Sequence, residues 1–548
     1  MGGTLALASV DSRGVEPYRG PNSFAFKSFE RPAGFMEGRG GRLGVSSANR
    51  PRTMTVRTRF APSPTGYLHI GGVRTALFNW LLAKRHGGQF ILRIDDTDQE
   101  RHVEEAVAKI VDGFKWLDML WDEGPEVGGP HQPYYQSQRQ HLYREAVDKL
   151  VAAGKVYRDY STDAEREADR DAAKKAKRAY RFRRVEHSDA DLKRFEEEGR
   201  PYALRFQVPP GRTLVLNDLV KGEVSFDTDE IGDFVIVRPG GQPLYNFASA
   251  VDDVEMKITH VVRAEEHLSN TFPQLLIHEA LGNTPPSFAH VPYVAEPGSH
   301  SKMSKRKTEE YEKRGILIFL HQYVERGYLP HALVNYLARL GWSFDDTQEL
   351  FTRAERIEKF SLARVNSSPA SLDPDKLFWI EGHWMKEAPL AEKVQGAIPF
   401  LQAEGLVATP IPDDRRALLE AVILALGDRM KTFSDVVKLG RFFFEDEIRY
   451  DPAAVKKRLR KPDVPAMLRE LDALLAETEP YDVATLEKAV HDFAEKTGRK
   501  MGDVVNPLRV ATTGQGVGPG LYDCLFLVGR DRCRARIAGA LATLDAEA

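Results

Sequence analysis

The clearest pattern of apolar and polar positions begins at residue 55. Side chains alternate in polarity over residues 56–60, which is the period of a β-strand. Two prolines in residues 61–66 then exclude both a helix and a sheet ladder. From His69 the apolar residues recur with helical spacing until the glycine pair at 87–88, and residues 89–94 return as a second strand. The pattern predicts a parallel βαβ unit, whose ligand binds beyond the carboxyl ends of the strands.

Helical patterns fill most of the later sequence. One helix is expected over residues 138–153, capped by Ser137 and ended by Gly154. Residues 323–342 show the spacing of a buried helix, and from about Lys386 the chain is almost wholly helical. The sequence therefore predicts an α/β region followed by an all-α region.

Length and composition narrow the class of protein. A chain of 548 residues is too long for one hydrophobic core, and roughly three to five domains are expected. No apolar run approaches the ~20 residues that a membrane span needs, so no membrane association is expected. The formal net charge is -3, which leaves any nucleic-acid contact to local basic surface. Cys524 and Cys533 are the only cysteines, so we expect no disulfide framework and a reducing, cytoplasmic location.

Residues 1–54 differ from the rest of the chain. They are rich in Gly, Ser, Arg and Pro and carry no periodic apolar pattern. We expect a disordered extension, which makes Met54 a candidate start of the folded protein.

Residues 60–72 carry the first chemical signature. Their sequence is Phe-Ala-Pro-Ser-Pro-Thr-Gly-Tyr-Leu-His-Ile-Gly-Gly, and it crosses the predicted strand, loop and helix start. His69, Gly71 and Gly72 resemble the HIGH signature of class I aminoacyl-tRNA synthetases. The final glycine and the Pro-Ser-Pro-Thr-Gly stretch before it are similar to bacterial glutamyl-tRNA synthetases. Two glycines at a helix start let the backbone approach an anion closely, and the resemblance implies that these three residues hold ATP.

A second signature, Ser-Lys-Met-Ser-Lys-Arg, follows at residues 301–306. Lysine suits a contact with a polyphosphate because it is a compact charge on a flexible stem. The stretch resembles the KMSKS loop of the same class, which implies that Lys302, Ser304 and Lys305 meet the phosphates of ATP. Magnesium (Mg2+) is expected to accompany ATP, and the sequence identifies no protein ligand for it.

Three further stretches resemble the amino-acid site of the glutamyl and glutaminyl branch. They are residues 92–98, residues 243–248 as a substrate-binding strand, and residues 258–267 as a buried strand that ends in charged residues. The resemblance implies a glutamate site formed by Arg59, Ala61, Ser63, Asp95, Tyr245, Ser249 and Arg263.

The charges of glutamate match this set of residues. Glutamate carries two carboxylates and one ammonium, so its site needs two cationic forks and one carboxylate. By resemblance, Arg59 is expected at the side-chain carboxylate, Arg263 at the α-carboxylate and Asp95 at the ammonium, and the two arginine roles can be exchanged. The residues alone leave Arg263 a second interpretation, an ion pair with Glu265 or Glu266.

Two positions depart from the glutamyl pattern. Asp95 stands where glutamyl enzymes usually carry glutamate and glutaminyl enzymes carry aspartate, which keeps a glutaminyl enzyme as an alternative. Ser249 stands where some relatives carry asparagine.

Some glutamyl enzymes hold zinc through cysteines in the region that residues 157–160 occupy here, and this stretch has no cysteine, so no zinc is expected.

The resemblance implies an α/β fold: a Rossmann-type catalytic domain with a parallel sheet and an inserted acceptor-stem domain, followed by a helical anticodon-binding domain. The implied reaction attaches L-glutamate to tRNA(Glu) through a glutamyl-adenylate, and a monomer is expected. Three other functions stay open: a shortened relative that glutamylates a modified tRNA base, a HIGH-type nucleotidyltransferase for small molecules, and a non-catalytic RNA-binding paralogue.

The expected divisions are 1–54 for the extension, 55–134 and 244–281 for the two catalytic halves, 135–243 for the insertion, 282–385 for the stem-contact region with the lysine loop, and 386–548 for the anticodon-binding domain.

Overall fold

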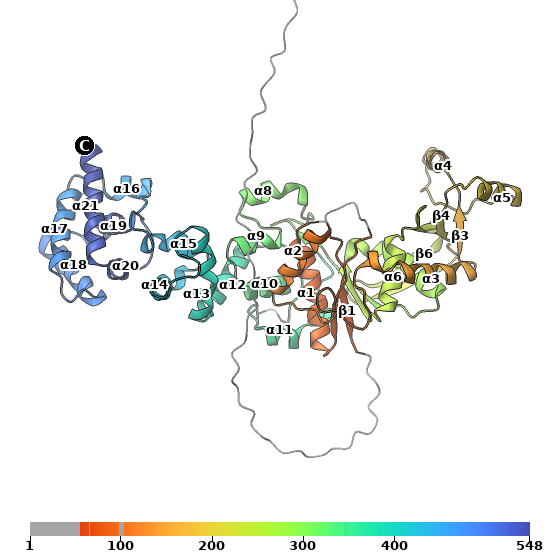
Figure 1. Ribbon diagram of the computed structural model, residues 1–548, viewed down its shortest axis with the longest axis horizontal. Helices are drawn as coiled ribbons and strands as arrows, with labels where there is room; N and C mark the ends of the chain where they lie inside the picture. The colour runs from red at the N-terminus through yellow and green to blue at the C-terminus, as the bar shows by residue number, and fades with distance from the viewer. Residues whose placement is uncertain (1–54, 65, 98–102, 346, 548) are drawn as a thin grey trace, which may run out of the picture.

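The computed structural model describes residues 55–547 except 65, 98–102 and 346, so the expected extension at 1–54 lies outside the described residues. The described part is elongated, with a parallel sheet near its middle, the insertion toward one end and the C-terminal helices at the other (Figure 1). None of the helices in this part combines the length and apolar character needed to span a bilayer.

A four-stranded parallel sheet forms the centre of the catalytic part. Its strands are β1 (Arg57–Phe60), β2 (Gln89–Leu92), β8 (His260–Ala264) and β9 (Ser287–Val291), in the order β2-β1-β8-β9. The predicted βαβ unit is confirmed, with α1 (Ile70–Arg85) as its crossover helix. β9 begins after residue 281, so the sheet continues past the expected end of the second catalytic half.

Helices cover both faces of this sheet. α1 packs on one face together with α10 (Pro330–Arg339), and α6 (Tyr245–Glu255) and α7 (Leu268–Ala280) pack on the other. Phe90 and Leu92 accordingly join the core around α1, while Ile91 joins the core around α6 and α7. Successive side chains of a strand point to opposite faces, so both faces of a covered sheet must be apolar.

The strand expected at residues 243–248 is wrong, because Tyr245 begins α6. Only Pro243 and Leu244 are extended, and the Leu244 amide donates to the Ile236 carbonyl at 2.8 Å. Apolar residues at 247, 248 and 251 share one helical face and are buried together, which favours the helix.

The insertion carries its own small sheet. Strands β3 (Val156–Asp159), β4 (Ala203–Phe206) and β7 (Phe234–Val237) pair antiparallel in the order β3-β4-β7. β5 (Thr213–Asp218) and β6 (Gly222–Asp227) form a hairpin. The helices between β2 and β5 are α2 (Val103–Trp116), α3 (Gln140–Ala152), α4 (Asp163–Lys175) and α5 (Asp189–Glu197).

The start of α3 differs from the prediction. Ser137 lies in a 3-10 turn and does not cap the helix, because its amide and hydroxyl both donate to the Asp96 carboxylate, at 2.8 and 2.7 Å. The predicted end is confirmed, since Gly154 follows the helix with φ of +65°.

The helix expected over residues 323–342 is interrupted. α9 (Leu320–Glu325) and α10 replace it, because Gly327 takes φ of +74° between them and Pro330 starts the second helix. β10 (Val294–Ala295) pairs with β11 (Ala370–Ser371) in this region. Its other helices are α8 (Thr308–Lys313), α11 (Arg353–Lys359) and α12 (Pro374–Glu387).

Within the described residues, every regular element from residue 390 onward is helical, which confirms the predicted all-α region. Cys524 and Cys533 are both free and buried there. The helices are α13 (Leu390–Ala403), α14 (Asp413–Leu426), α15 (Asp435–Gly440), α16 (Pro452–Arg458), α17 (Val464–Glu477), α18 (Val483–Thr497), α19 (Met501–Thr513), α20 (Leu521–Val528) and α21 (Arg530–Glu547).

Candidate active site

His69 caps the N-terminus of α1. Its Nδ1 accepts a hydrogen bond from the Gly71 amide at 3.1 Å, so this nitrogen carries no proton. The backbone of residues 68–70 is fixed from the other side by residues 318–320, through two hydrogen bonds of 2.9 Å. A β-carbon at Gly71 would lie 3.3 Å from the imidazole, whereas one at Gly72 would meet only Phe60 at 3.9 Å. The amides of residues 70–73 already donate to Ile318 and His69, so the helix start holds a fixed imidazole and two glycines without side chains, which leave room for an anion at the positive end of the helix dipole.

The lysine loop lies next to this helix start. Val294 of β10 would be 3.8 Å from a β-carbon at Gly71, and the loop of residues 301–304 folds back on β10. Met303 is buried, and its amide donates to the Val294 carbonyl at 3.3 Å. One buried side chain thus anchors a loop whose neighbouring side chains face outward.

Lys302, the first cation of the loop, has an exposed acidic partner. Lys302 contacts the Glu266 carboxylate and lowers the pKa of that carboxyl group. Ser304 caps the next turn by accepting from the Arg306 amide at 3.3 Å. The side chain of Lys305 lies outside the described part of the structure. Since the Lys302 ion pair is half exposed, little energy opposes its exchange for a ligand phosphate.

Asp95 lies in a buried chain of charges at the carboxyl end of β2. Arg93 donates to Asp95 Oδ1 through Nε and to Asp253 Oδ1 through Nη1, both at 2.8 Å. Asp253 also accepts from Arg59, at 3.2 and 3.4 Å. Arg93 is fully buried and the other three are nearly so. The order Arg59–Asp253–Arg93–Asp95 alternates in sign, and Asp95 is neither a surface charge nor a helix cap.

The two aspartates of this chain differ in proton affinity. Burial raises the pKa of Asp95 to about 6 despite the opposing charge of Arg93. Burial also acts to raise the pKa of Asp253, but the charges of Arg59 and Arg93 outweigh it and lower that pKa. Asp95 Oδ2 is buried and has no hydrogen-bond partner among the described residues. Because an unsatisfied buried acceptor is costly, this oxygen suits a cationic donor on a ligand.

The side chain of Arg263, on β8, contacts neutral groups. Its guanidinium donates to Thr271 Oγ1 at 2.6 Å, His290 Nε2 at 3.1 Å and Tyr245 Oη at 3.4 Å. Burial lowers its pKa, and only 5% of the residue is exposed. No carboxylate lies at ion-pair distance from Arg263 within the described residues. A buried arginine without an anion is costly, so the site suits a carboxylate on the ligand.

The ion pair between Arg263 and Glu265 or Glu266, considered from the sequence, is wrong. Glu265 pairs with Lys221 at 2.5 Å, and Glu266 contacts Lys302. Both neighbouring acids are therefore occupied elsewhere.

The other residues predicted to bind glutamate differ in how deeply they are buried. Tyr245 is 37% exposed at the start of α6, so it is not a core tyrosine. Ser249 is buried beneath the charges, where it accepts from Arg93 Nη2 at 3.3 Å. Ala61 is half-buried and Ser63 is exposed, on the loop that follows β1.

Five polar residues that complete the site were not predicted: Arg93, Asp218, Asp253, Thr271 and His290. A signal existed for Arg93, because an arginine between apolar neighbours at the end of a buried strand requires an acidic partner. The other four lie on different elements that pair only in the folded chain, and no local pattern reports that meeting.

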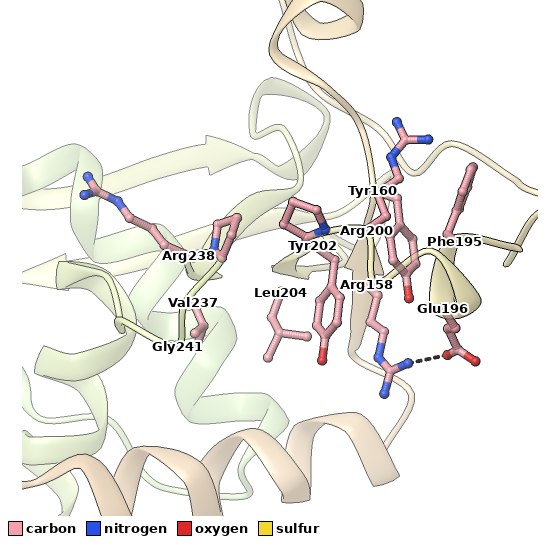
Figure 2. A pocket seen from close by; sticks show the side chains of 14 residues that line it. Arg158, Tyr160, Phe195, Glu196, Arg200, Tyr202, Leu204, Val237, Arg238 and Gly241 are labelled. Atoms are coloured by element: carbon pink, nitrogen blue, oxygen red, sulfur yellow. Dashed lines mark hydrogen bonds and ion pairs between the residues drawn. The ribbon is translucent and has the colours of Figure 1, made fainter. Parts of the chain in front are cut away.

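A separate concavity of about 440 Å³ lies in the insertion (Figure 2). Arg158 pairs there with Glu196 at 2.5 Å, and its guanidinium lies 4.9 Å from the Tyr202 ring centre. Further basic and aromatic residues of the lining are Tyr160, Phe195, Arg200 and Arg238. Tyr160 and Phe195 are buried, and the guanidinium of Arg200 lies 4.4 Å from the Phe195 ring centre, so the concavity presents mainly positive charge, which suits a phosphate backbone.

The described residues contain no group of three or more His, Cys, Asp or Glu side chains arranged to hold a metal ion. In the region considered for zinc, hydrogen bonds hold the strands together. Tyr157 donates to Asp233 at 2.9 Å, and Arg205 donates to Asp159 at 2.5 Å.

Two family models match the chain and agree with this geometry. The model described as "tRNA synthetases class I (E and Q), catalytic domain" matches residues 55–379, and "Anticodon binding domain" matches residues 390–541. Fold and signatures thus define a class I aminoacyl-tRNA synthetase. A relative named glutamate–tRNA ligase, from Moorella thermoacetica, is 43% identical over 484 residues, or 88% of this chain and 97% of that protein. The chain belongs to the glutamate–tRNA ligase family.

Other comparisons give the same result. The glutamate–tRNA ligase of Halalkalibacterium halodurans is 41% identical over 89% of this chain and 99% of its own. The crystal structure of a glutamate tRNA ligase from Elizabethkingia meningosepticum, in complex with its amino acid, has a TM-score of 0.79 at 32% identity. It covers 89% of this chain and 100% of the solved chain. These relatives favour the glutamyl interpretation over the glutaminyl and small-molecule alternatives.

Proposed function

We propose that the chain attaches L-glutamate to tRNA(Glu) in two steps. An oxygen of the α-carboxylate attacks the α-phosphorus of ATP, which forms glutamyl-adenylate and releases pyrophosphate. The terminal ribose hydroxyl of the tRNA then attacks the activated carbonyl and releases AMP. No protein nucleophile is needed, so the residues contribute by positioning and by stabilising charge on the phosphates. The observation that carries the proposal is the buried Arg263, which has no acidic partner among the residues that the structure describes. It lies within electrostatic reach of Arg59 and Asp253, in whose cluster Asp95 Oδ2 has no described partner.

The charge chain supports one assignment of the two arginines. The ammonium and α-carboxylate of an amino acid share one carbon, so their protein partners must be close together. Asp95, which we assign to the ammonium, is linked through Arg93 and Asp253 to Arg59. Arg263 lies outside this linked group. We therefore assign Arg59 to the α-carboxylate and Arg263 to the side-chain carboxylate, the exchanged form of the roles implied by resemblance.

Tyr245 fits the same assignment, because its hydroxyl accepts from Arg263 and can donate to a carboxylate that the arginine holds. Ser249 helps to position Arg93 by accepting a hydrogen bond from its guanidinium. Ala61, through its backbone, and Ser63 are assigned to the amino end of the substrate.

ATP is assigned to the start of α1 and to the lysine loop. His69, Gly71 and Gly72 would hold the nucleotide, and Lys302, Ser304 and Lys305 would meet its phosphates. Lys302 would then exchange the Glu266 carboxylate for phosphate oxygens, which keeps its charge paired throughout. Magnesium would enter with ATP and neutralise phosphate charge, and we assign it no protein ligand.

The RNA is assigned to the two ends of the elongated chain. The insertion at 135–243, with its basic and aromatic concavity, would contact the acceptor stem, and the helical region at 386–548 would contact the anticodon. Unpaired anticodon bases can be splayed onto a protein surface, unlike bases within an A-form stem. A cytoplasmic monomer is the form in which we expect the protein to act.

Charging assays with purified tRNA(Glu) and tRNA(Gln), each with glutamate and glutamine, test this function. We expect glutamylation of tRNA(Glu), and glutamate-dependent ATP–pyrophosphate exchange that needs tRNA, because RNA-binding energy assembles the site. Preferred charging of glutamine would support the glutaminyl alternative. Strong exchange without RNA would instead support a small-molecule nucleotidyltransferase.

A further inference from the structure

A buried pair, Asp218 and His290, stands behind Arg263. His290 is fully buried on β9, in register with Arg263 on β8, and Asp218 ends β5. The Nδ1 of His290 lies 2.6 Å from Asp218 Oδ2, and its Nε2 lies 3.1 Å from Arg263 Nε. Thr271 is close to both, at 2.6 Å from Arg263 Nη2 and 3.1 Å from His290 Nε2.

The partners of the imidazole fix its proton. Asp218 accepts from the backbone amides of Val220, Lys221 and His290 at 2.8 to 3.1 Å. Burial acts to raise the pKa of Asp218, but the hydrogen bond with the His290 side chain and those with the three amides outweigh it and lower that pKa. An ionised carboxylate only accepts, so His290 Nδ1 must carry the proton. Nε2 is then an acceptor, as the N–H of Arg263 requires. Burial lowers the pKa of His290, which agrees with a neutral ring.

We propose that Asp218 and His290 are positioning residues that aim the Arg263 guanidinium at the side-chain carboxylate of the substrate. The inference rests on the proposed function, since it deepens the role of Arg263 in glutamate binding. Nε and Nη2 of Arg263 are taken by His290 and Thr271, which fixes the plane of the fork. Nη1, beside Tyr245, is the part of the fork turned toward the ligand.

The arrangement also makes the insertion part of the amino-acid site. Asp218 belongs to the β5–β6 hairpin, which is held to the sheet by the Leu219 amide and the Phe288 carbonyl at 2.9 Å. In this proposal the hairpin acts on the substrate through the tautomer of His290.

Asp218→Asn tests the tautomer with almost no change in shape. The asparagine oxygen, in the place of Oδ1, keeps the contacts with the amides of Val220, Lys221 and His290, and only the contact of Oδ2 with the His290 amide is lost. The new NH2 group donates to His290 Nδ1 and forces the proton onto Nε2, against the N–H of Arg263. We expect kcat/KM for glutamate to fall roughly 10- to 100-fold, the loss typical of a buried orienting group. For glutamine, which lacks the side-chain carboxylate, the change should be less than about threefold by the same reasoning. Asp227→Asn, an exposed change on the same hairpin, is the matched control and should leave both substrates unaffected.

His290→Gln and His290→Asn provide a second test that leaves Asp218 in place. Glutamine positions an acceptor near the former Nε2, whereas asparagine reaches only the former Nδ1 position, so the Gln variant should retain more glutamate selectivity. Equal loss for glutamate and glutamine in Asp218→Asn, no loss at all, or equal behaviour of the two His290 variants would overturn the inference. If Asp218→Asn also lowers the unfolding temperature, the two His290 variants decide. If the wild-type protein does not attach glutamate to tRNA(Glu), the proposed function itself is refuted. Results from the variants alone cannot give that outcome.

Discussion

Replacing Arg263 by glutamine should remove the preference for glutamate over glutamine. Within the described part of the chain, the hydrogen-bond partners of the guanidinium are all neutral: the hydroxyls of Thr271 and Tyr245 and the imidazole of His290. In the assigned site its charge is balanced by the side-chain carboxylate of the substrate. Glutamine, with an amide in that place, leaves the buried charge unbalanced.

The size of the effect follows from this burial. Loss of a charge-assisted pair in a desolvated site costs about 2–4 kcal/mol, so wild-type protein should use glutamine roughly 30- to 1000-fold less well in kcat/KM. In Arg263→Gln, glutamate should lose about that factor, because its carboxylate then lacks the cation. Glutamine should lose far less, and the two substrates should become similar.

Steady-state charging of tRNA(Glu) with each amino acid measures both ratios. Arg59→Gln is the matched comparison, since it should damage both substrates, which share the α-carboxylate. Thermal unfolding must accompany it, because Arg59 is also a partner of Asp253. If Arg263→Gln impairs both amino acids equally while Arg59→Gln impairs mainly glutamate, the two arginine roles are those first implied by resemblance, and the argument from proximity to Asp95 is refuted.

Three further predictions concern the acid, the lysine loop and the metal. Burial raises the pKa of Asp95 to about 6, and the ionised form is the one that binds the ammonium, so kcat/KM for both amino acids should fall about tenfold per pH unit below 6. Asp95→Asn should lower kcat/KM for both amino acids and abolish this fall at acidic pH. If the fall at acidic pH is unchanged in the variant, Asp95 is not the group that titrates. Lys305→Ala should lower kcat by ~10²–10³-fold with a smaller effect on ATP affinity. Lys313→Ala, an exposed change, should alter neither kcat nor ATP affinity. Near-normal turnover in Lys305→Ala would show that the loop takes no part in the mechanism. Elemental analysis should find no stoichiometric zinc, and chelators should leave the unfolding temperature unchanged, because Asp159 and Asp233 join the strands of the insertion by hydrogen bonds. One tightly held zinc per chain would contradict this.

Much of the fold was predictable because it rests on local patterns. Alternation over residues 56–60 and helical spacing after His69 identify β1 and α1, since each reports a face that must be buried. The errors occur where a tertiary contact overrides a local preference. Ser137 is a good cap by composition, but the buried Asp96 takes both of its donors. Residues 243–248 look extended until the helical spacing of the residues after Tyr245 is considered.

The candidate site was predictable only in part, for the same physical reason. Arg59, Asp95 and Arg263 each stand at the end of a predicted strand, and parallel strands bring such ends together. The partners of Arg59 and Arg263 come from α6, α7 and β9, whose positions depend on the packing of both sheet faces. No spacing in the sequence connects Asp218 with His290, or Asp253 with Arg93, before the chain has folded.

The aspartate at position 95 illustrates how the structure changes the weight of a sequence signal. Its shorter side chain is typical of glutaminyl enzymes, and in the sequence it was the main argument for one. In the structure Asp95 bonds to Arg93 through Oδ1 and leaves Oδ2 for a ligand donor, which we assign to the ammonium. Glutamate and glutamine share that ammonium, so the length of the acid at this position cannot select between them. Selection must occur where the two substrates differ, at the side-chain carboxylate, and the unpaired charge of Arg263 favours the acid over the amide.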